Sequence, residues 1–150
     1  MYRNILVPID GSAAGARGLA EAIKLAGGHG SRIRIIHVLD LAPLSPHLSG
    51  KKFDEAFEQL RDYGINLLNT GEAGVRRAAI ETDSKLVEAK SGSIGKHIID
   101  EAIAWPADLI ICGTHGRRGL RRLLLGSDAE EVLRESPVPV MLVRAGSRAR

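Results

Sequence analysis

The chain has 150 residues, of which 44% are apolar, 21 are Lys or Arg and 18 are Asp or Glu, giving a formal net charge of +3. This length suits one domain over residues 1–150, with residues from about 144 to 150 expected to form a flexible tail. No uncharged stretch approaches the roughly 18 residues of a membrane span. A strand-like pattern begins too early for us to expect a signal peptide, and the single cysteine excludes an internal disulfide framework. We therefore expect a cytoplasmic protein.

Strand-like and helix-like patterns alternate along the chain. Residues 5–9 are an apolar run typical of a buried parallel strand, and Ser12 is expected to start a helix that ends near residue 27. A second strand at 33–39 and a loop at 43–50 precede a long helix, whose buried stripe spans 53–68. The remaining expected elements are a weaker strand at 82–89, a helix at 94–105, a strand at 109–112, a helix at 127–134 and a strand at 138–143.

This alternation predicts an α/β fold with a doubly wound, five-stranded parallel sheet in the order 3-2-1-4-5. In that order the chain reverses direction between strands 1 and 4, and a crevice opens at their carboxyl ends. The first strand leads into Asp10 and the fourth into Gly113, about a hundred residues later. We therefore expect these two segments to face each other across the crevice.

A glycine-spaced segment follows the fourth strand. Gly113-Thr114-His115-Gly116 is followed nine residues later by Gly126-Ser127, where a helical pattern begins. A strand, a glycine loop and a helix N-terminus let backbone N–H groups point at an anion, most often a phosphate. The spacing predicts a nucleotide site.

Each of these residues also has a purely structural interpretation. Asp10, followed by Gly11-Ser12, could shape a strand-to-helix turn, and the loop glycines could serve the turn alone. Ser127 and Glu130 match a capping box, in which the hydroxyl serves its own helix. His115 has no partner acid or second ligand at a supporting spacing, so we assign it neither catalysis nor metal binding.

The charged residues near this loop have opposing effects on a phosphate. Four arginines fall within six residues, at 117, 118, 121 and 122, and offer either phosphate contacts or a solvated basic face. Asp128 would favour the helix dipole by about 0.3 to 1 kcal/mol but would repel a triphosphate at the same helix end, unless an arginine or a Mg²⁺ ion offsets it. With 3% aromatic residues, base stacking is not supported, so we do not expect nucleic acid as a partner. A nucleic-acid-binding role for the arginine loop would require an affinity that falls steeply with salt.

Three motifs of nucleotide-using enzymes and hydrolases are missing from the sequence. It has no G-x-x-x-x-G-K-[ST] loop, no G-x-S-x-G elbow and no G-x-G-x-x-G after the first strand. We find no residue to nominate as a catalytic base. The sequence therefore favours a nucleotide-responsive binding module over an efficient catalyst.

Three blocks resemble the universal stress protein family: residues 5–12, the pattern Gly113-x-x-Gly116-x9-Gly126-Ser127, and residues 136–143. The resemblance covers essentially the whole chain. It implies a Rossmann-like α/β sandwich (adenine-nucleotide alpha-hydrolase-like), frequent homodimers and, in the branch with this glycine spacing, ATP binding with weak or no hydrolysis. Asp128 departs from the family pattern, where a small apolar residue usually follows the Gly-Ser pair.

Carried over to this chain, the resemblance implies a ligand site with adenosine at one end and phosphates at the other. Asp10 would take a ribose hydroxyl or a phosphate-bound Mg²⁺, and Val38 would meet the adenine edge. Gly126 and Ser127 would hold the β- and γ-phosphates, helped by a backbone N–H of residue 128. The full implied set is Pro8, Asp10, Val38, Cys112, Gly113, Thr114, Gly116, Arg117, Gly126, Ser127 and Asp128.

Two functional hypotheses follow. The first is an ATP-binding stress protein whose occupancy changes its shape or its protein partners, which the sequence does not identify. The second is a dimeric structural or interaction protein of the same fold that does not bind ATP. Residues 138–143 are apolar and expected at a sheet edge, so we expect a homodimer through this strand.

Overall fold

The structure is a computed structural model that describes residues 1–115 and 125–146. Strands and helices alternate through the described chain, as the sequence predicts. The elements are β1 (Asn4–Pro8), α1 (Ala13–Ala26), β2 (Arg32–Asp40), α2 (Gly50–Arg77), β3 (Glu81–Ala89), α3 (Ile94–Ala104), β4 (Leu109–Gly113), α4 (Ser127–Glu135) and β5 (Val140–Val143).

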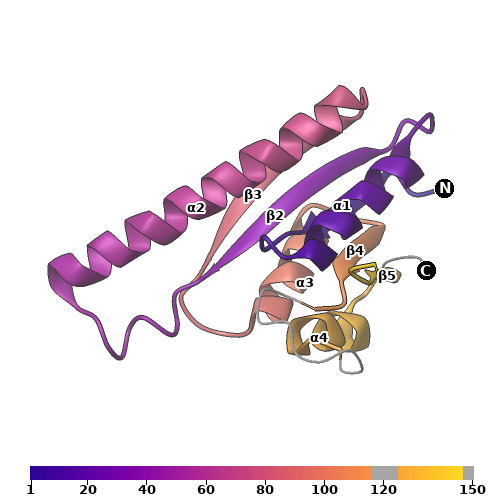
Figure 1. Ribbon diagram of the computed structural model, residues 1–150. Helices are drawn as coiled ribbons and strands as arrows, with labels where there is room; N and C mark the ends of the chain where they lie inside the picture. Colours follow the sequence, from indigo (N-terminus) through magenta and orange to yellow (C-terminus); the bar gives the residue numbers. More distant parts are fainter. Residues whose placement is uncertain (116–124, 147–150) are drawn as a thin grey trace.

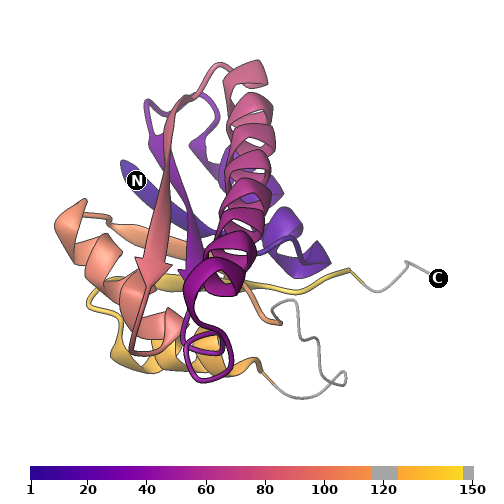
Figure 2. The ribbon, with the colours of Figure 1, turned by 90° about the vertical axis from the view of Figure 1, so that its left-hand side faces the viewer.

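The five strands form one parallel sheet in the order β3-β2-β1-β4-β5, which confirms the predicted topology. β1 is central, with Leu6 opposite Arg34 of β2 on one side and Ile110 of β4 on the other. The two ribbon views show α1 and α2 on one face of the sheet and α3 and α4 on the other (Figures 1 and 2). The chain thus reverses direction beside β1, where a doubly wound sheet opens its crevice.

Both faces of the sheet are buried, which explains the apolar runs in the strand sequences. Ile5 and Val7 of β1 belong to the cluster under α1 and α2, whereas Leu6 belongs to the cluster under α3 and α4. All three side chains are fully buried, and burying such a side chain stabilises the fold by about 1.5–3 kcal/mol. The two clusters hold the sheet rigidly beneath the crevice.

The helix α2 runs on to Arg77, beyond the buried stripe at 53–68 that the sequence pattern predicts. Its buried positions are Gly64, Leu68, Gly71 and Val75, spaced four, three and four residues apart. Two of them are glycines that bring the helix close to the sheet: a Cβ on Gly71 would lie 3.1 Å from Ile35 Cδ1. Beyond Leu68 the buried positions are Gly71 and Val75, and the glycine adds little apolar signal to the stripe.

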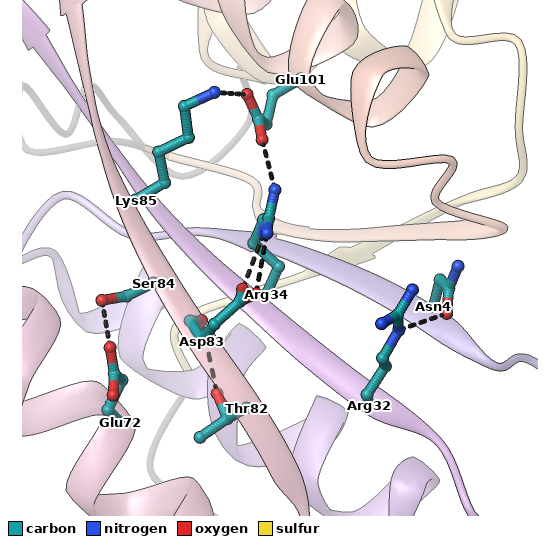
Figure 3. A network of polar contacts seen from close by, with 9 residues as sticks. All are labelled: Asn4, Arg32, Arg34, Glu72, Thr82, Asp83, Ser84, Lys85 and Glu101. Carbon is teal, nitrogen blue, oxygen red and sulfur yellow. Dashed lines mark hydrogen bonds and ion pairs between the residues drawn. The ribbon is translucent and has the colours of Figure 1, made fainter.

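A charged cluster fastens α3 to β2 and β3 (Figure 3). Arg34 lies between two carboxylates, 2.7 Å from Asp83 and 2.9 Å from Glu101, and Lys85 Nζ lies 2.6 Å from the second Glu101 oxygen. The hydrogen bond from Arg34 lowers the pKa of Asp83, and its partner Asp83 raises the pKa of Arg34. Glu101 is buried, so this pairing compensates a desolvated charge.

The only tryptophan of the chain lies beside this cluster. Trp105 ends α3 and is 7% exposed. The guanidinium carbons of Arg32 and Arg34 lie 5.1 and 5.0 Å from its ring centroid, within the range of cation–π attraction. Together with the ion pairs, these contacts fix α3 on the sheet, and the N-terminal end of α3 borders the crevice.

Candidate functional site

A cleft opens at the carboxyl ends of β1 and β4, where the topology predicts it. Its lining residues enclose about 630 Å³ of space between protein atoms, a volume that includes open solvent. Pro8 and Asp10 line it from the end of β1, Val38 from β2 and Gly113 from β4. Segments that are far apart in the sequence thus share one cavity.

The turn after β1 places Asp10 in the cleft. The Asp10 Oδ1 atom accepts a hydrogen bond from the backbone N–H of Ser12 at 2.9 Å, and Gly11 has a φ of +85°, which favours glycine. Ser12 then caps α1, since its Oγ accepts a hydrogen bond from Gly15 N at 3.1 Å. Asp10 therefore shapes the strand-to-helix turn and lines the cleft as well, so the two interpretations of this residue are compatible.

The same turn is supported from behind by β2 and α2. The imidazole Nδ1 of His37, a buried residue, is 2.8 Å from the carbonyl oxygen of Ile9. Tyr63 donates a longer hydrogen bond, 3.4 Å, to the carbonyl oxygen of Asp10, and its ring packs edge-on against His37. These contacts fix the backbone that carries the Asp10 carboxylate.

The middle of the cleft is apolar. The lining residues there are Val38, Cys112, Ile94, Ile98 and, from α4, Ala129 and Val132. Burial raises the pKa of the Cys112 thiol to about 12, so this cysteine is a neutral apolar surface at physiological pH. A wall of this kind suits a flat aromatic ring better than a charged group.

Gly113 has a packing role that the sequence did not reveal. A Cβ on this residue would lie 2.7 Å from the carbonyl carbon of Ala14 and 2.8 Å from Gly15 N. The first turn of α1 therefore rests directly on the end of β4. This close approach of two main chains accounts for the glycine without any ligand.

Thr114 is tied by main-chain hydrogen bonds to β5 and to the far end of the glycine loop. Thr114 N donates to Val143 O at 2.9 Å, and Gly126 N donates to Thr114 O at 2.7 Å. Thr114 is buried and is not among the residues that line the cleft, so its role in the structure is to close the loop. The implied ligand residues Gly116 and Arg117, and the arginines at 118, 121 and 122, lie outside the described residues.

The start of α4 differs from the expected capping box. The helix begins at Ser127 and its N-cap is Gly126, with no side-chain capping bond. The capping-box prediction is therefore wrong, because Ser127 stands one position too late to cap. Backbone N–H groups of the first helical turn have no partner inside the helix, and Gly126 and Asp128 line the cleft at this end, whereas Ser127 does not.

The structure brings together seven of the eleven implied ligand residues, namely Pro8, Asp10, Val38, Cys112, Gly113, Gly126 and Asp128. It also adds residues that the sequence analysis missed, among them Ser12, Gly15, Ile94 and Ile98. The signal for Ser12 was available, since it follows the first strand and all strand-to-helix junctions of a parallel sheet share one edge, whereas Gly15, Ile94 and Ile98 lie within α1 and α3.

His115 also lines the cleft, and its ring is partly engaged. The Nδ1 atom is 3.1 Å from Thr114 Oγ1, while Nε2 is buried without a hydrogen-bond partner among the described residues. In the described part of the chain, no three His, Cys, Asp or Glu residues are grouped to hold a metal ion. No described helix is both long and apolar enough to cross a membrane.

Comparison with known sequences gives one consistent result. The model of the universal stress protein family matches residues 1–144. A universal stress protein of Thermus aquaticus is 32% identical over 144 residues, covering 96% of this chain and all of that protein. A universal stress protein of Methanocaldococcus jannaschii is 31% identical over 145 residues, covering 96% of this chain and 83% of that protein.

Solved structures share the fold. The hypothetical protein MJ0577 superposes with a TM-score of 0.83 at 23% identity, covering 98% of this chain and 99% of its own. A universal stress protein in complex with cAMP has a TM-score of 0.70 at 22% identity, covering 97% and 99%. A family member from Arabidopsis thaliana with AMP bound also has a TM-score of 0.70, at 15% identity, covering 97% and 93%.

Proposed function

The chain belongs to the universal stress protein family, and on that basis we propose that it is an adenine-nucleotide binding module, with ATP as its ligand. Occupancy of the cleft would change the shape of the protein or its choice of protein partner in a stress response. The observation that carries this proposal is the convergence of Asp10, Val38, Gly113 and Gly126 on one cleft at the switch point of the sheet.

The cleft offers a suitable surface for each part of the ligand. The apolar wall around Val38 and Cys112 would hold the adenine ring, and the Asp10 carboxylate would accept a hydrogen bond from a ribose hydroxyl. The phosphates would lie near Gly126, where the first N–H groups of α4 point outward. A bound Mg²⁺ would neutralise part of the phosphate charge.

The comparisons support an adenine ligand without identifying the phosphate number. Two proteins of the same fold were solved with AMP and with cAMP, which share the adenine ring and ribose. We propose that those parts of the ligand would lie at the Asp10 and Val38 end of the cleft.

Isothermal titration calorimetry with ATP, with and without Mg²⁺, tests the proposal. Gly126→Val is the variant of choice, because Gly126 has φ −60° and ψ 147°, which any residue can adopt. The fold should therefore persist while the new side chain enters the ligand space and abolishes binding. Gly74→Ala is the control, since a Cβ there would meet only the end of Arg77 at 3.8 Å.

Two results would contradict the proposal. One is the absence of heat and of any shift in melting temperature with millimolar ATP, ADP, AMP and cAMP. The other is unchanged affinity in Gly126→Val. Mass spectrometry of small molecules released on denaturing the purified protein would identify the ligand that is bound in the cell.

We also propose a homodimer through β5, the basis of the alternative interaction role. β5 is a four-residue edge strand, and Met141 within it is 38% exposed. Met141→Lys should shift the protein to monomers in light scattering, because a lysine on an edge strand opposes strand pairing. Leu25→Lys is a matched control, since Leu25 is 36% exposed and lies on a helix, α1, rather than on the edge strand. A monomeric wild type at micromolar concentration would refute the dimer.

A further inference from the structure

The two ends of α3 are held by different contacts. At the C-terminal end, Glu101 and Trp105 fasten the helix to β2 and β3 through the charged cluster. At the N-terminal end, which borders the cleft, the helix meets α4. There it is fastened by Glu131 of α4, which is not itself one of the residues that line the cleft.

Three residues form this second fastening, which we call the α3–α4 joint: Ser93, Gly95 and Glu131. The Ser93 hydroxyl caps α3 by accepting a hydrogen bond from Lys96 N at 3.1 Å, and it donates to Glu131 Oε1 at 2.7 Å. A Cβ on Gly95 would lie only 2.6 Å from Glu131 Oε2 and 3.0 Å from Glu131 Cβ. Gly95 has no positive φ, so this close contact, and not the backbone conformation, accounts for the glycine.

The joint lies beside the residues that form the apolar wall of the cleft. Ile94 and Ile98 line the cleft from α3, and Ala129 and Val132 line it from α4. Ile94 stands between the two α3 members of the joint, and Val132 directly follows its α4 member. In α4, which is described throughout its nine residues, the buried residues are Ala129 and Val132. Few apolar contacts therefore hold this short helix, and the polar joint contributes strongly to its placement.

We propose that Glu131 is a positioning residue, which sets the separation of α3 and α4 and thereby the fit of the apolar wall to the adenine ring. This inference rests on the proposed function and deepens it, because it gives a residue outside the cleft a role in base recognition. A gap of about 0.5–1 Å between facing atoms forfeits roughly a quarter to a half of their dispersion attraction. A loosened joint should therefore weaken the binding of every adenine nucleotide by a similar factor.

Isothermal titration calorimetry with AMP and with Mg²⁺-ATP, well below the melting temperature, tests the inference on the whole chain. Glu131→Ala removes the acceptor of the Ser93 hydroxyl and should weaken both ligands by the same factor, roughly threefold to tenfold. Glu131→Gln loses the same charge but keeps an oxygen that can accept from Ser93, so its affinities should stay within about twofold of the wild type. Glu135→Ala is the control in the same helix, since Glu135 is exposed and pairs with Arg134, and it should also stay within about twofold.

Gly95→Ala disrupts the joint from the opposite helix. Its Cβ would displace the Glu131 carboxylate, so this variant should lose affinity by a factor similar to that of Glu131→Ala. Because both substitutions break the same contact, the double variant Gly95→Ala/Glu131→Ala should bind within about twofold of the weaker single variant. Factors that multiply in the double variant would show that the two residues act independently and would overturn the inference.

Other results would overturn it as well. A lower melting temperature of Glu131→Ala with unchanged affinities would show a role in stability alone. Equal losses in Glu131→Ala and Glu131→Gln would assign the effect to charge, and a loss confined to Mg²⁺-ATP would assign it to the phosphates. Each of these results leaves the wild type a nucleotide-binding protein. Failure of both AMP and Mg²⁺-ATP to bind the wild type would instead overturn the proposed function and the inference together.

Discussion

The contact between α1 and β4 leads to a sharp prediction for Gly113→Ala. The new Cβ would lie 2.7 Å from the carbonyl carbon of Ala14 and 2.8 Å from both Ala14 Cβ and Gly15 N. Two of these three atoms belong to the backbone, so no side-chain rotation relieves the contact. The first turn of α1 would have to move by about 0.7 Å or more to restore ordinary van der Waals separation.

The magnitude follows from how firmly α1 is held. Its inner residues Ala22 and Ala26 are almost completely buried in the core, so the helix cannot tilt away without disturbing that packing. Overpacking of this kind costs typically 1–3 kcal/mol, and we expect the upper part of that range, about 2–3 kcal/mol. For a domain of this size this lowers the melting temperature by roughly 4–12 °C.

Gly18→Ala is the matched control at the same contact. Its Cβ would lie 3.7 Å from the carbonyl carbon of Cys112 and from Gly113 N, which is an ordinary distance. Replacing a helical glycine by alanine stabilises a helix by up to about 1 kcal/mol, so this variant should melt at the same temperature or higher.

Urea unfolding followed by Trp105 fluorescence measures both variants, because the indole is 7% exposed in the folded protein and becomes solvated on unfolding. An unchanged midpoint for Gly113→Ala would refute the packing argument. It would return the explanation of this glycine to ligand access alone.

Three further predictions follow from the charged cluster and the cleft. Glu101→Ala should destabilise the fold by about 1.5–3 kcal/mol, because it removes two charge-assisted hydrogen bonds, while Arg34 keeps its pair with Asp83 and Lys85 is half exposed. Asp100→Asn on the exposed side of the same helix should change stability by less than about 1 kcal/mol. Arg34 lowers the folded-state pKa of Asp83, so the stabilisation from Asp83 is present above the unfolded-state pKa and is lost as the pH falls through the folded-state pKa. The difference in unfolding free energy between wild type and Asp83→Asn should therefore close on acidification. A constant difference in denaturation curves from pH 7 to pH 2 would contradict this. Burial raises the pKa of the Cys112 thiol from 9.0 to about 12, so less of the reactive thiolate is present at pH 8. The thiol should therefore react with a thiol reagent about 10³-fold more slowly in the folded protein than in urea. Equal rates would show that the cleft opens to the reagent.

The fold could be predicted from the sequence because its signal is repeated in every unit. Apolar runs such as residues 5–9 and 109–112 identify strands covered on both faces, and the alternation with helices leaves one common topology. The end of α2 could not be predicted in the same way. Gly64 and Gly71 lie on its buried face, and a Cβ on Gly64 would meet His37 Cδ2 at 2.8 Å, but a glycine adds almost nothing to hydrophobic periodicity.

The site could be predicted as a place more readily than as a set of contacts. Asp10 and Gly113 were expected to meet because the topology brings their strands together, and both line the cleft. The interpretation of Ser127 failed because a shift of one residue in the helix start turns a capping residue into a first-turn residue. The contribution of Ile94 and Ile98 depends on how α3 leans over the sheet, which tertiary packing decides.

The two edges of the sheet differ in a way that limits assembly. β5 is short and apolar, whereas β3 is nine residues long and exposes Glu81, Asp83 and Lys85 along one side. If two copies pair through β5, the joined sheet ends in a charged β3 strand at each extremity, where a further strand would be repelled. Growth of the sheet would then stop at two chains, and the concentration of the protein could rise without seeding fibres.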